Sequence, residues 1–471
     1  MPRGGGSAAA HETSPAVPRS GRPWAAARRA PRRLAGVLRP PVTPDRRVLV
    51  ASLALQLVLG LLFGHSYDTR VFMGTGFLAG TGHDPYVPLN LSRIFHHAGF
   101  SLIASIGYPP PWPLALGLIY RAVYVPVHSF LLYNLAIKIP VIAANVALAY
   151  LVGALLRALG VSPAVAARAW VLVLLNPLLL YVGAAWGEID AIVALLSLAA
   201  LALLLVRRRE RFGLLCDGSA VLLAFAVCVK PTAAPFVAAV LVFLARGSLL
   251  RAARYGVVCL AGVLLFYVAP FYVYHWSRAP FSQRLNVHFV QQGALSFMTV
   301  VRPFRDPLLM QGRWWLLGLL WIPALVVGMA VASRSGDGGF DDLLRKCAGL
   351  ALIVFLTRSW LAETNVVLIL PPVLILACRG VLDRRAPTAV WLIPLVFTVF
   401  NASPLQLLWV AFPQTMVRLL DDVGLYANVT LLARAALVVA WQVAGWWIVA
   451  GCLRARRVPT AAPTAVAGGV R

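Results

Sequence analysis

Two carboxylates near the start of the chain stand out in a basic and apolar sequence. The segment GHSYDTRVFMGTGFLAGTGHDPYVP, residues 64–88, holds Asp68 and Asp84, although the chain has only 16 acidic residues against 42 Lys and Arg. A carboxylate within hydrogen-bond reach of a hydroxyl can accept its proton as a general base. Asp68 follows the first long apolar run closely and is our candidate base. The alternative is that it caps a following short helix, since Asp is favoured there.

Further ionisable residues lie at the start or end of later apolar runs. WGEIDAIVALL carries Glu188 and Asp190 at the start of one run, where a helix dipole would also favour acids. VCVKPTAAPF places Lys230 in apolar surroundings, where it could meet Asp190 or a lipid phosphate. Ionisable groups near a bilayer are costly, so their convergence at one membrane face predicts a site there.

The late segment TRSWLAETNVVLILPP supplies Arg358, Glu363 and Asn365, and an ion pair between the first two is the simpler explanation. Arg302 and Arg305 fall in an earlier polar segment and join the same set. Arg can neutralise a departing phosphate through two donors at once. We expect Arg302, Arg358, Glu363 and Asn365 to contact substrate.

Loop residues around the two first carboxylates complete the predicted site. Arg70 could orient or pair with Asp68. GTGHDPYVP has the composition of a turn, so Asp84 is either an Asx-type turn residue or a sugar or metal contact. Tyr86 and Tyr108 could pack against a sugar face or simply pack within the loop. No metal site is expected, since the adjacent pair His96 and His97 would point about 100° apart on a helix.

The composition indicates which elements must position these residues. The 471-residue chain is 60% hydrophobic and 12% charged, and its mean hydropathy is +0.81. Apolar runs of roughly 17–25 residues recur, the length that crosses a bilayer. Short strands of alternating polarity are lacking, which argues against a transmembrane barrel. We predict an all-α integral membrane protein, a polytopic bundle of about 11–13 transmembrane helices.

The net charge of +26 does not indicate nucleic-acid binding. The cations are mostly Arg in short clusters between apolar runs, as in cytoplasmic loops under the positive-inside rule. Predicted spans are Val48–Gly64, 129–156, 168–186, 190–206, 213–229, 232–246, 255–275, 313–332, 347–360, 365–378, 388–402 and 429–452. All Arg clusters lie inside if the proline-flanked stretch 109–129 does not cross.

That topology divides the chain into an arm, a membrane domain and a tail. Residues 1–47 are rich in Gly, Ala, Pro and Arg and are expected to form a disordered cytoplasmic arm. Residues 48–453 form the membrane domain, with extracytoplasmic loops near 65–128, 276–312 and 403–428, and 454–471 form a cytoplasmic tail. The first loop is unusually long. We expect a multi-pass protein of the cell membrane.

A polyprenyl-phosphate sugar would suit such a face. Its lipid tail needs a groove in the membrane-spanning part of the protein. Its phosphate would lie at the membrane interface, and its sugar would lie in a polar loop. An acceptor hydroxyl would attack the anomeric carbon as the lipid phosphate leaves, and base-assisted attack opposite the leaving group inverts that centre. The chemistry needs no cofactor; a divalent metal is conceivable but lacks support in the residues.

Four segments, in this order, resemble polytopic GT-C glycosyltransferases: SYDTRVFMGTGFLAGTGHDPY, GYPPPWPLALGL, the passage from WGEIDAIVALL to KPTAAPF, and RSWLAETNVVLILPP. The pattern is most similar to polyprenyl-phosphate-mannose-dependent mannosyltransferases and GPI-mannosyltransferase relatives, over roughly residues 48–378. The resemblance implies an acidic base in the first loop, here Asp68. It departs at Arg70, where a second acid is common, and at Glu188, where Gln is more usual.

The predicted function is therefore transfer of a hexose, with mannose favoured, from a polyprenyl-phosphate donor to a lipid or glycan acceptor on the extracytoplasmic face. The transfer inverts the anomeric centre, with Asp68 as the general base. The main alternative is a transporter or a flippase for lipid-linked sugars, which buried charges would also suit. Against it, the chain halves show no convincing repeat. A non-catalytic membrane scaffold is the third alternative, which the convergence of charges disfavours.

Overall fold

The computed structural model describes residues 45–87, 106–205, 212–279, 293–301, 315–401, 403–413 and 429–454, with the single residues 95, 282 and 426. Nearly all of the predicted arm 1–47 and tail 454–471 lies outside this set, as do the predicted site residue Arg302 and its neighbour Arg305.

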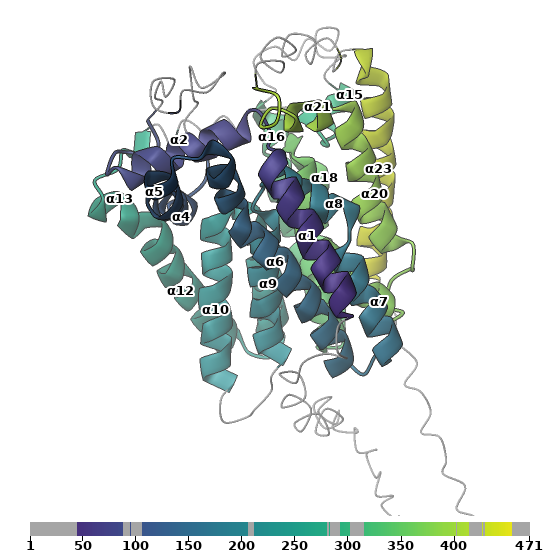
Figure 1. Cartoon of the computed structure of the whole chain (residues 1–471). Coiled ribbons are helices and arrows are strands. Elements are labelled where there is room, and N and C mark those ends of the chain that lie inside the picture. The colour runs from purple at the N-terminus through teal and green to yellow at the C-terminus, as the bar shows by residue number, and fades with distance from the viewer. Residues whose placement is uncertain are drawn as a thin grey trace, which may run out of the picture.

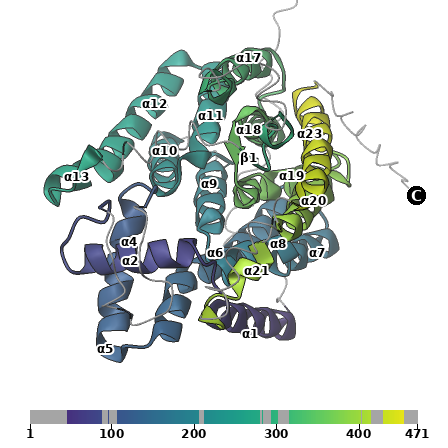
Figure 2. The ribbon, with the colours of Figure 1, turned by 90° about the horizontal axis from the view of Figure 1, so that it is seen from above.

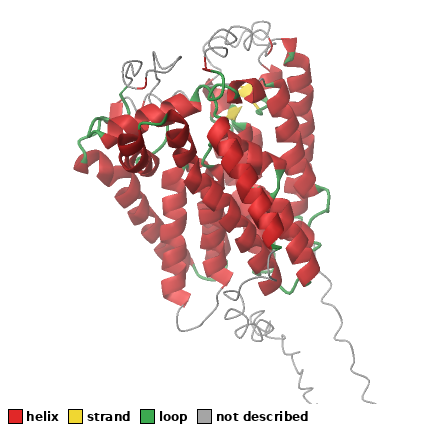
Figure 3. Ribbon diagram, viewed as in Figure 1, coloured by secondary structure: helices red, strands yellow, loops and turns green. Residues whose placement is uncertain are grey.

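Helices make up almost all of the described chain (Figure 3). The amino-terminal part contains α1 (Arg46–Leu62), α2 (Asp68–Gly80), α4 (Pro111–Ile119), η2 (Tyr120–Tyr124), α5 (Val125–Val127), α6 (Phe130–Ala158), α7 (Pro163–Leu174), α8 (Pro177–Leu179) and η3 (Leu180–Trp186). The middle part contains α9 (Asp190–Leu205), α10 (Phe212–Val229), η4 (Pro231–Ala233), α11 (Ala234–Ala245), α12 (Leu249–Val263), η5 (Leu264–Val268) and α13 (Ala269–Val273).

The carboxyl-terminal part contains two very short strands among its helices. Its elements are β1 (Gly293–Ala294), α15 (Met298–Val301), α16 (Trp315–Gly318), α17 (Trp321–Arg334), α18 (Phe340–Thr357), β2 (Trp360–Leu361), η7 (Glu363–Leu368), α19 (Leu370–Cys378), α20 (Ala386–Phe400), α21 (Ser403–Leu407) and α23 (Leu431–Leu453). Strands β1 and β2 pair in parallel, with Gly293 opposite Trp360.

The bundle has the character of a membrane protein. Five described helical stretches are long and apolar enough to cross a bilayer, Phe130–Ala158, Pro163–Trp186, Leu249–Val273, Leu316–Arg334 and Leu431–Leu453, and several shorter apolar helices accompany them. Peripheral helices expose large apolar side chains, among them Val58 on α1, Val257 on α12 and Val443 on α23. Water would penalise such a surface, whereas lipid would not. The chain is an all-α polytopic membrane protein, as predicted.

Several span boundaries differ from the sequence prediction. The predicted span 168–186 begins earlier, because Ser162 caps α7 with Pro163 at its first position, and α7, α8 and η3 continue to Trp186. The predicted span 347–360 also begins earlier, at Phe340, so that the charged residues expected in a loop lie inside α18. Their burial is possible because Asp342 pairs with both Arg345 and Lys346 within the helix.

Helix α18 is the centre of the bundle. All its residues from Asp342 to Thr357 are buried, and it contacts α11, α17, α19 and α23 (Figure 2). It has 18 residues, so it spans about 27 Å. Arg246 at the end of α11 lies beside Asp342 at the start of α18, so these antiparallel helices bring Lys230, before α11, to the end of the bundle where Arg358 follows α18.

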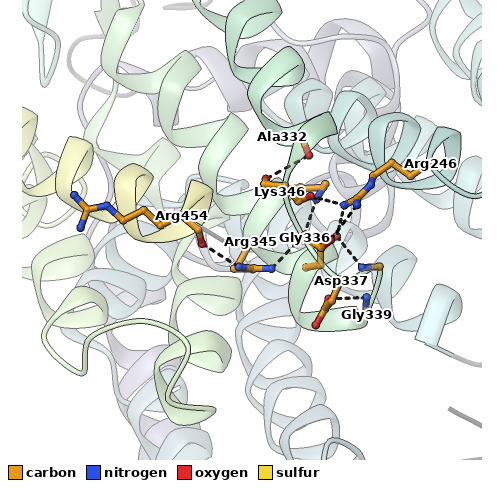
Figure 4. A network of polar contacts seen from close by, with 11 residues as sticks. Arg246, Ala332, Gly336, Asp337, Gly339, Arg345, Lys346 and Arg454 are labelled. Atoms are coloured by element: carbon orange, nitrogen blue, oxygen red, sulfur yellow. Dashed lines mark hydrogen bonds and ion pairs between the residues drawn. The ribbon is translucent and has the colours of Figure 1, made fainter. Parts of the chain in front are cut away.

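The Asp342 end of the bundle holds a buried charge network (Figure 4). Asp342 lies 2.5 Å from Lys346 Nζ, 3.3 Å from an Arg345 nitrogen and 3.6 Å from an Arg246 nitrogen. Lys346 also donates to the carbonyl oxygen of Ser335, and Arg345 to that of Arg454. Three cations therefore share one carboxylate. Their contacts join the ends of α11, α17 and α23 to the start of α18.

Helices lie across one side of the opposite end of the bundle. Figures 1 and 2 show α2 and the α4–α5 segment crossing each other there. Two glycines allow the close crossing: a Cβ on Gly76 would lie 2.9 Å from the Leu116 carbonyl oxygen, and one on Gly80 would lie 2.6 Å from the Tyr120 ring. The crossing fixes α2, whose first residue is Asp68.

Candidate functional site

Asp68 begins α2 without capping it. The residue before it, Tyr67, occupies the cap position and makes no side-chain capping bond. Instead, the indole Nε1 of Trp186 donates to Asp68 Oδ2 at 2.8 Å, and His65 Nδ1 lies 3.0 Å from the same oxygen. The side chain of Asp68 is 21% exposed. The carboxylate is thus oriented by a distant tryptophan, which excludes the alternative that it serves only as a helix cap.

The two residues that hold Asp68 are themselves packed together. The rings of His65 and Trp186 stack with centroids 4.2 Å apart and planes 8° apart. The amides of Gly64 and Ser66 donate to the carbonyl oxygens of Leu407 and Gln406, which anchors the segment before α2 on α21. Trp186 ends η3, and Gly187 follows with φ +96°, a conformation that glycine adopts without strain.

A second group of charges lies next to Asp68. Lys230 Nζ donates to Asp190 Oδ2 at 2.7 Å and to Glu188 Oε2 at 3.2 Å. Tyr108 Oη donates to the same Glu188 oxygen at 2.9 Å, and the ammonium lies 5.4 Å from the centre of the Tyr108 ring. Four predicted site residues, Tyr108, Glu188, Asp190 and Lys230, are therefore brought together in one buried cluster.

The electrostatics of the cluster follow from one ammonium facing several carboxylates. Burial opposes ionisation of Asp68, but His65, the Trp186 N–H and Lys230 outweigh it, and the net effect lowers the pKa of Asp68. Burial raises the pKa of Glu188 to about 7, aided by Asp68 and Asp190 and opposed by Lys230. Burial would lower the pKa of Lys230, yet Asp190 and Glu188 raise it. Because Asp190 is the closer partner of Lys230, Glu188 is the carboxylate left incompletely neutralised.

Arg358 is placed differently from the paired Lys230. It follows α18 directly and precedes β2, at the same end of the bundle as Lys230. No hydrogen-bond or ion-pair partner for its guanidinium occurs among the described residues, so the simple ion pair with Glu363 is not formed there. Burial lowers the pKa of Arg358, but not enough to discharge a guanidinium. A partly buried cation is thus available for an anion.

Three of the predicted loop contacts have structural roles. Asp84 accepts from the amide of Tyr86 at 2.9 Å and from that of Ser277 at 2.6 Å, which is the turn interpretation. Tyr86 is fully buried, stacks on Phe271 and donates to the Tyr108 carbonyl oxygen. Its ring faces are used in packing. Arg70 Nε donates to the Ser66 carbonyl oxygen, so it braces the turn before α2.

The η7 segment lies beside the charged cluster, since η7 contacts both α9 and η4. Glu363 is buried and accepts from Asn401 at 3.3 Å. Asn365 is also buried, and its Oδ1 has no hydrogen-bond partner in the described part of the chain; the same holds for Asp190 Oδ1 and the Thr232 hydroxyl. Buried polar atoms without partners are unusual, and they mark positions where a polar ligand gains hydrogen bonds.

Sequence inspection did not single out Trp186 or give His65 a role beside Asp68. Trp186 is the first residue of WGEIDAIVALL, the motif that supplies Glu188 and Asp190. An indole donor next to two carboxylates was the feature of the sequence that could have indicated its role. As for metals, no group of three His, Cys, Asp or Glu side chains among the described residues is arranged to hold an ion.

Comparison with known proteins bears on residues 63–246, the part of the chain that carries Asp68 and the buried charged cluster. No curated protein matches the sequence. Residues 63–246 match the family model described as MptA_B family, alpha-(1->6)-mannopyranosyltransferase, N-terminal domain. The matched segment includes Asp68, Trp186, Glu188, Asp190 and Lys230. This match supports a glycosyltransferase, a mannosyltransferase of the GT-C type, and the helical membrane fold is consistent with it.

Proposed function

We propose that the protein transfers mannose from a polyprenyl-phosphate donor to a lipid or glycan acceptor, with inversion, on the extracytoplasmic face of the cell membrane. Asp68 accepts the proton of the acceptor hydroxyl while the oxygen of that hydroxyl bonds to the anomeric carbon. The bond from that carbon to the phosphate oxygen breaks, and polyprenyl phosphate departs with the electron pair.

The orientation of Asp68 is the observation that carries the proposal. Its Oδ2 receives the Trp186 N–H and faces His65, whereas its Oδ1 has no partner among the residues described. The lowered pKa keeps the carboxylate ionised at neutral pH. One oxygen is therefore anchored and the other remains open to an incoming hydroxyl, which is the arrangement that a general base requires.

The departing phosphate needs a cation that is not already committed. Lys230 is shared between Glu188 and Asp190, so among the described residues we assign Arg358 to the lipid phosphate. A guanidinium can donate to two phosphate oxygens and stabilise the charge that develops as the bond breaks. The unpartnered oxygens of Asp190 and Asn365 would accept from sugar hydroxyls.

The family description restricts the stereochemistry of the donor. A transfer that forms an α-(1→6) linkage with a single inversion must begin from a sugar whose anomeric phosphate is in the β configuration. The acceptor would be the primary hydroxyl of a mannose unit. The donor we assign is thus β-mannosyl phosphate on a polyprenyl chain.

The orientation in the membrane follows from the basic residues. Arg246, Arg345, Lys346 and Arg454 gather at the Asp342 end, opposite Asp68. Under the positive-inside rule that end faces the cytoplasm. The α2–α4 crossing and Asp68 then face outward. On that side the sugar donor would be polyprenyl-linked rather than nucleotide-linked.

The experiment uses purified full-length protein in lipid vesicles with radiolabelled β-mannosyl-phosphoryl polyprenol and an α-mannoside acceptor. We expect wild-type product with an α-(1→6) linkage, and a fall of at least about 1,000-fold for Asp68→Asn, the upper part of the usual range for a general base. Asp217→Asn, which alters a carboxylate at the opposite end, is the matched control and keeps full activity. Equal activity of Asp68→Asn would refute the base, and use of a nucleotide-linked mannose in place of the lipid donor would refute the donor class.

A further inference from the structure

Lys138 is a buried cation whose partners are all main-chain atoms. It lies in the first half of α6 and is 1% exposed. Its Nζ donates to the carbonyl oxygens of Gly60 at 3.3 Å, Ala185 at 2.9 Å and Phe63. No carboxylate pairs with Lys138 anywhere in the described ranges. Burying an ammonium is costly, and an apolar side chain here would avoid that cost.

The three carbonyl groups belong to two helix ends. Gly60 and Phe63 mark the end of α1, and Ala185 is the penultimate residue of η3. The last carbonyls of a helix lack partners within it and carry the negative end of the helix dipole, so a cation there is favourable. Asn134, one turn earlier on α6, adds bonds to Gly60, Leu61 and Phe63.

Each of these ends leads directly into half of the site. Three residues after Gly64 the chain reaches Tyr67 and then Asp68, whereas Ala185 is followed at once by Trp186. The stem of Lys138 also packs under the next turn: a Cβ on Gly187 would lie 3.0 Å from Lys138 Cε. One side chain therefore touches both segments whose meeting forms the Trp186–Asp68 hydrogen bond.

We propose that Lys138 is a positioning residue that fixes the end of α1 against the end of η3, so that Trp186 meets Asp68 in the geometry that proton transfer needs. The effect on catalysis rests on the function proposed above, but the claim that Lys138 holds the two helix ends together does not. Misplacing a catalytic group by about 1 Å can cost on the order of 100-fold in rate. Such a loss should fall on kcat, because Lys138 itself is buried beneath the site.

The test compares Lys138→Met and Lys138→Gln with Asn145→Leu. Asn145 lies two turns after Lys138 on α6. It also links α1 to the α8 region, because its amide nitrogen donates to Gln56 and to the Leu179 carbonyl oxygen, but these contacts are remote from Asp68. We expect Lys138→Met to lower kcat about 100-fold with little change in the donor KM. Lys138→Gln keeps donor groups and should recover part of that loss. Asn145→Leu should retain the wild-type kcat even where it lowers the melting temperature.

Hydrogen exchange without substrate supplies a readout that is independent of the reaction. The amides of Gly64, Ser66, Gly187 and Glu188 are hydrogen-bonded to main-chain oxygens in the structure. Loosening either helix end should speed their exchange in Lys138→Met and in Lys138→Gln to a lesser degree, and leave them unchanged in Asn145→Leu.

Wild-type exchange in both Lys138 variants would overturn the positioning role, as would equal acceleration in Asn145→Leu, which would make Lys138 a general stabilising residue. Faster exchange confined to the Lys138 variants, combined with full activity of Asp68→Asn, would refute the proposed base and leave the positioning of Trp186 against residue 68 intact. If Lys138→Met does not fold, Lys138→Gln carries both measurements.

Discussion

The indole nitrogen of Trp186 and the carboxylate of Asp68 are joined by a 2.8 Å hydrogen bond, although the two residues are 118 positions apart in the chain. The bond links the first residue of α2 to the last residue of η3. It places an ionised carboxylate at the edge of the Glu188–Asp190–Lys230 cluster, in which the Lys230 charge helps to lower the pKa of Asp68. Several consequences of this arrangement can be measured.

The first prediction concerns the Trp186 donor. Trp186→Phe keeps an aromatic ring beside His65 but removes the N–H, and a hydrogen bond to a charged group contributes about 1.5–3 kcal/mol. We expect kcat to fall roughly 10- to 100-fold. Trp170→Phe is the matched control, because Trp170 is also buried and its Nε1 has no partner among described residues. Identical kcat values for the two variants would contradict a role for the indole donor.

The second prediction concerns the cation for the lipid phosphate. Replacing Arg358 by Gln should lower kcat/KM for the polyprenyl donor about 100-fold, the effect of removing one preorganised donor at a developing charge. Arg358→Lys should keep part of the activity, since it preserves the charge but not the planar fork. Arg379→Gln, which alters an Asp341 partner at the opposite end, is the control. A donor kcat/KM equal to wild type in Arg358→Gln would remove Arg358 from the site.

The third prediction is a pH dependence of stability that originates at Glu188. Its pKa is raised from 4.5 to about 7 in the folded protein, so between these values the folded state binds more protons than the unfolded state. The contribution of Glu188 to stability is then fully present below pH 4.5 and is lost as the pH rises through 7.

Glu188→Gln removes this titration. The melting temperature of the wild-type protein relative to this variant should therefore fall between pH 5 and pH 8, the range that brackets the folded pKa of about 7. Thermal unfolding in detergent at several pH values measures it. A constant difference across the range would show that Glu188 does not titrate there, and a rising difference would reverse the sign of the pKa shift.

The fourth prediction concerns the charge network at the opposite end. Asp342→Asn leaves Arg345 and Lys346 buried without a carboxylate, and breaking a buried ion pair costs about 3–5 kcal/mol. A marked drop in the melting temperature is expected. Asp217→Asn interrupts an ion pair with the exposed Arg254 and should change it little. Similar melting temperatures for both variants would mean that the network of Figure 4 does not stabilise the bundle.

The sequence alone was sufficient for the class of protein and for one part of the site. Run length and composition are local properties, and they correctly predicted an all-α membrane protein, because a bilayer accepts only long apolar segments whose backbone is internally bonded. The mannosyltransferase resemblance agrees with the family match over 63–246. Of the two partners that the sequence allowed for Lys230, Asp190 or a lipid phosphate, the structure shows Asp190; both residues lie at the end of an apolar run, where a charge requires a partner.

Tertiary packing decided what each polar residue touches. Sequence patterns left Asp68 as either a base or a cap, and Asp84 as either a ligand or a turn residue. In the structure Tyr67 occupies the cap position and Asp68 accepts from Trp186, whereas two main-chain amides donate to Asp84 in the turn. Lys138 and the residues of the Asp342 network lie within or at the ends of helices. In the sequence they look like ordinary polar residues that interrupt or flank an apolar run. Their partners come from helices distant in the chain, and the crossing of helices that unites them depends on side-chain packing over the whole bundle rather than on any local pattern.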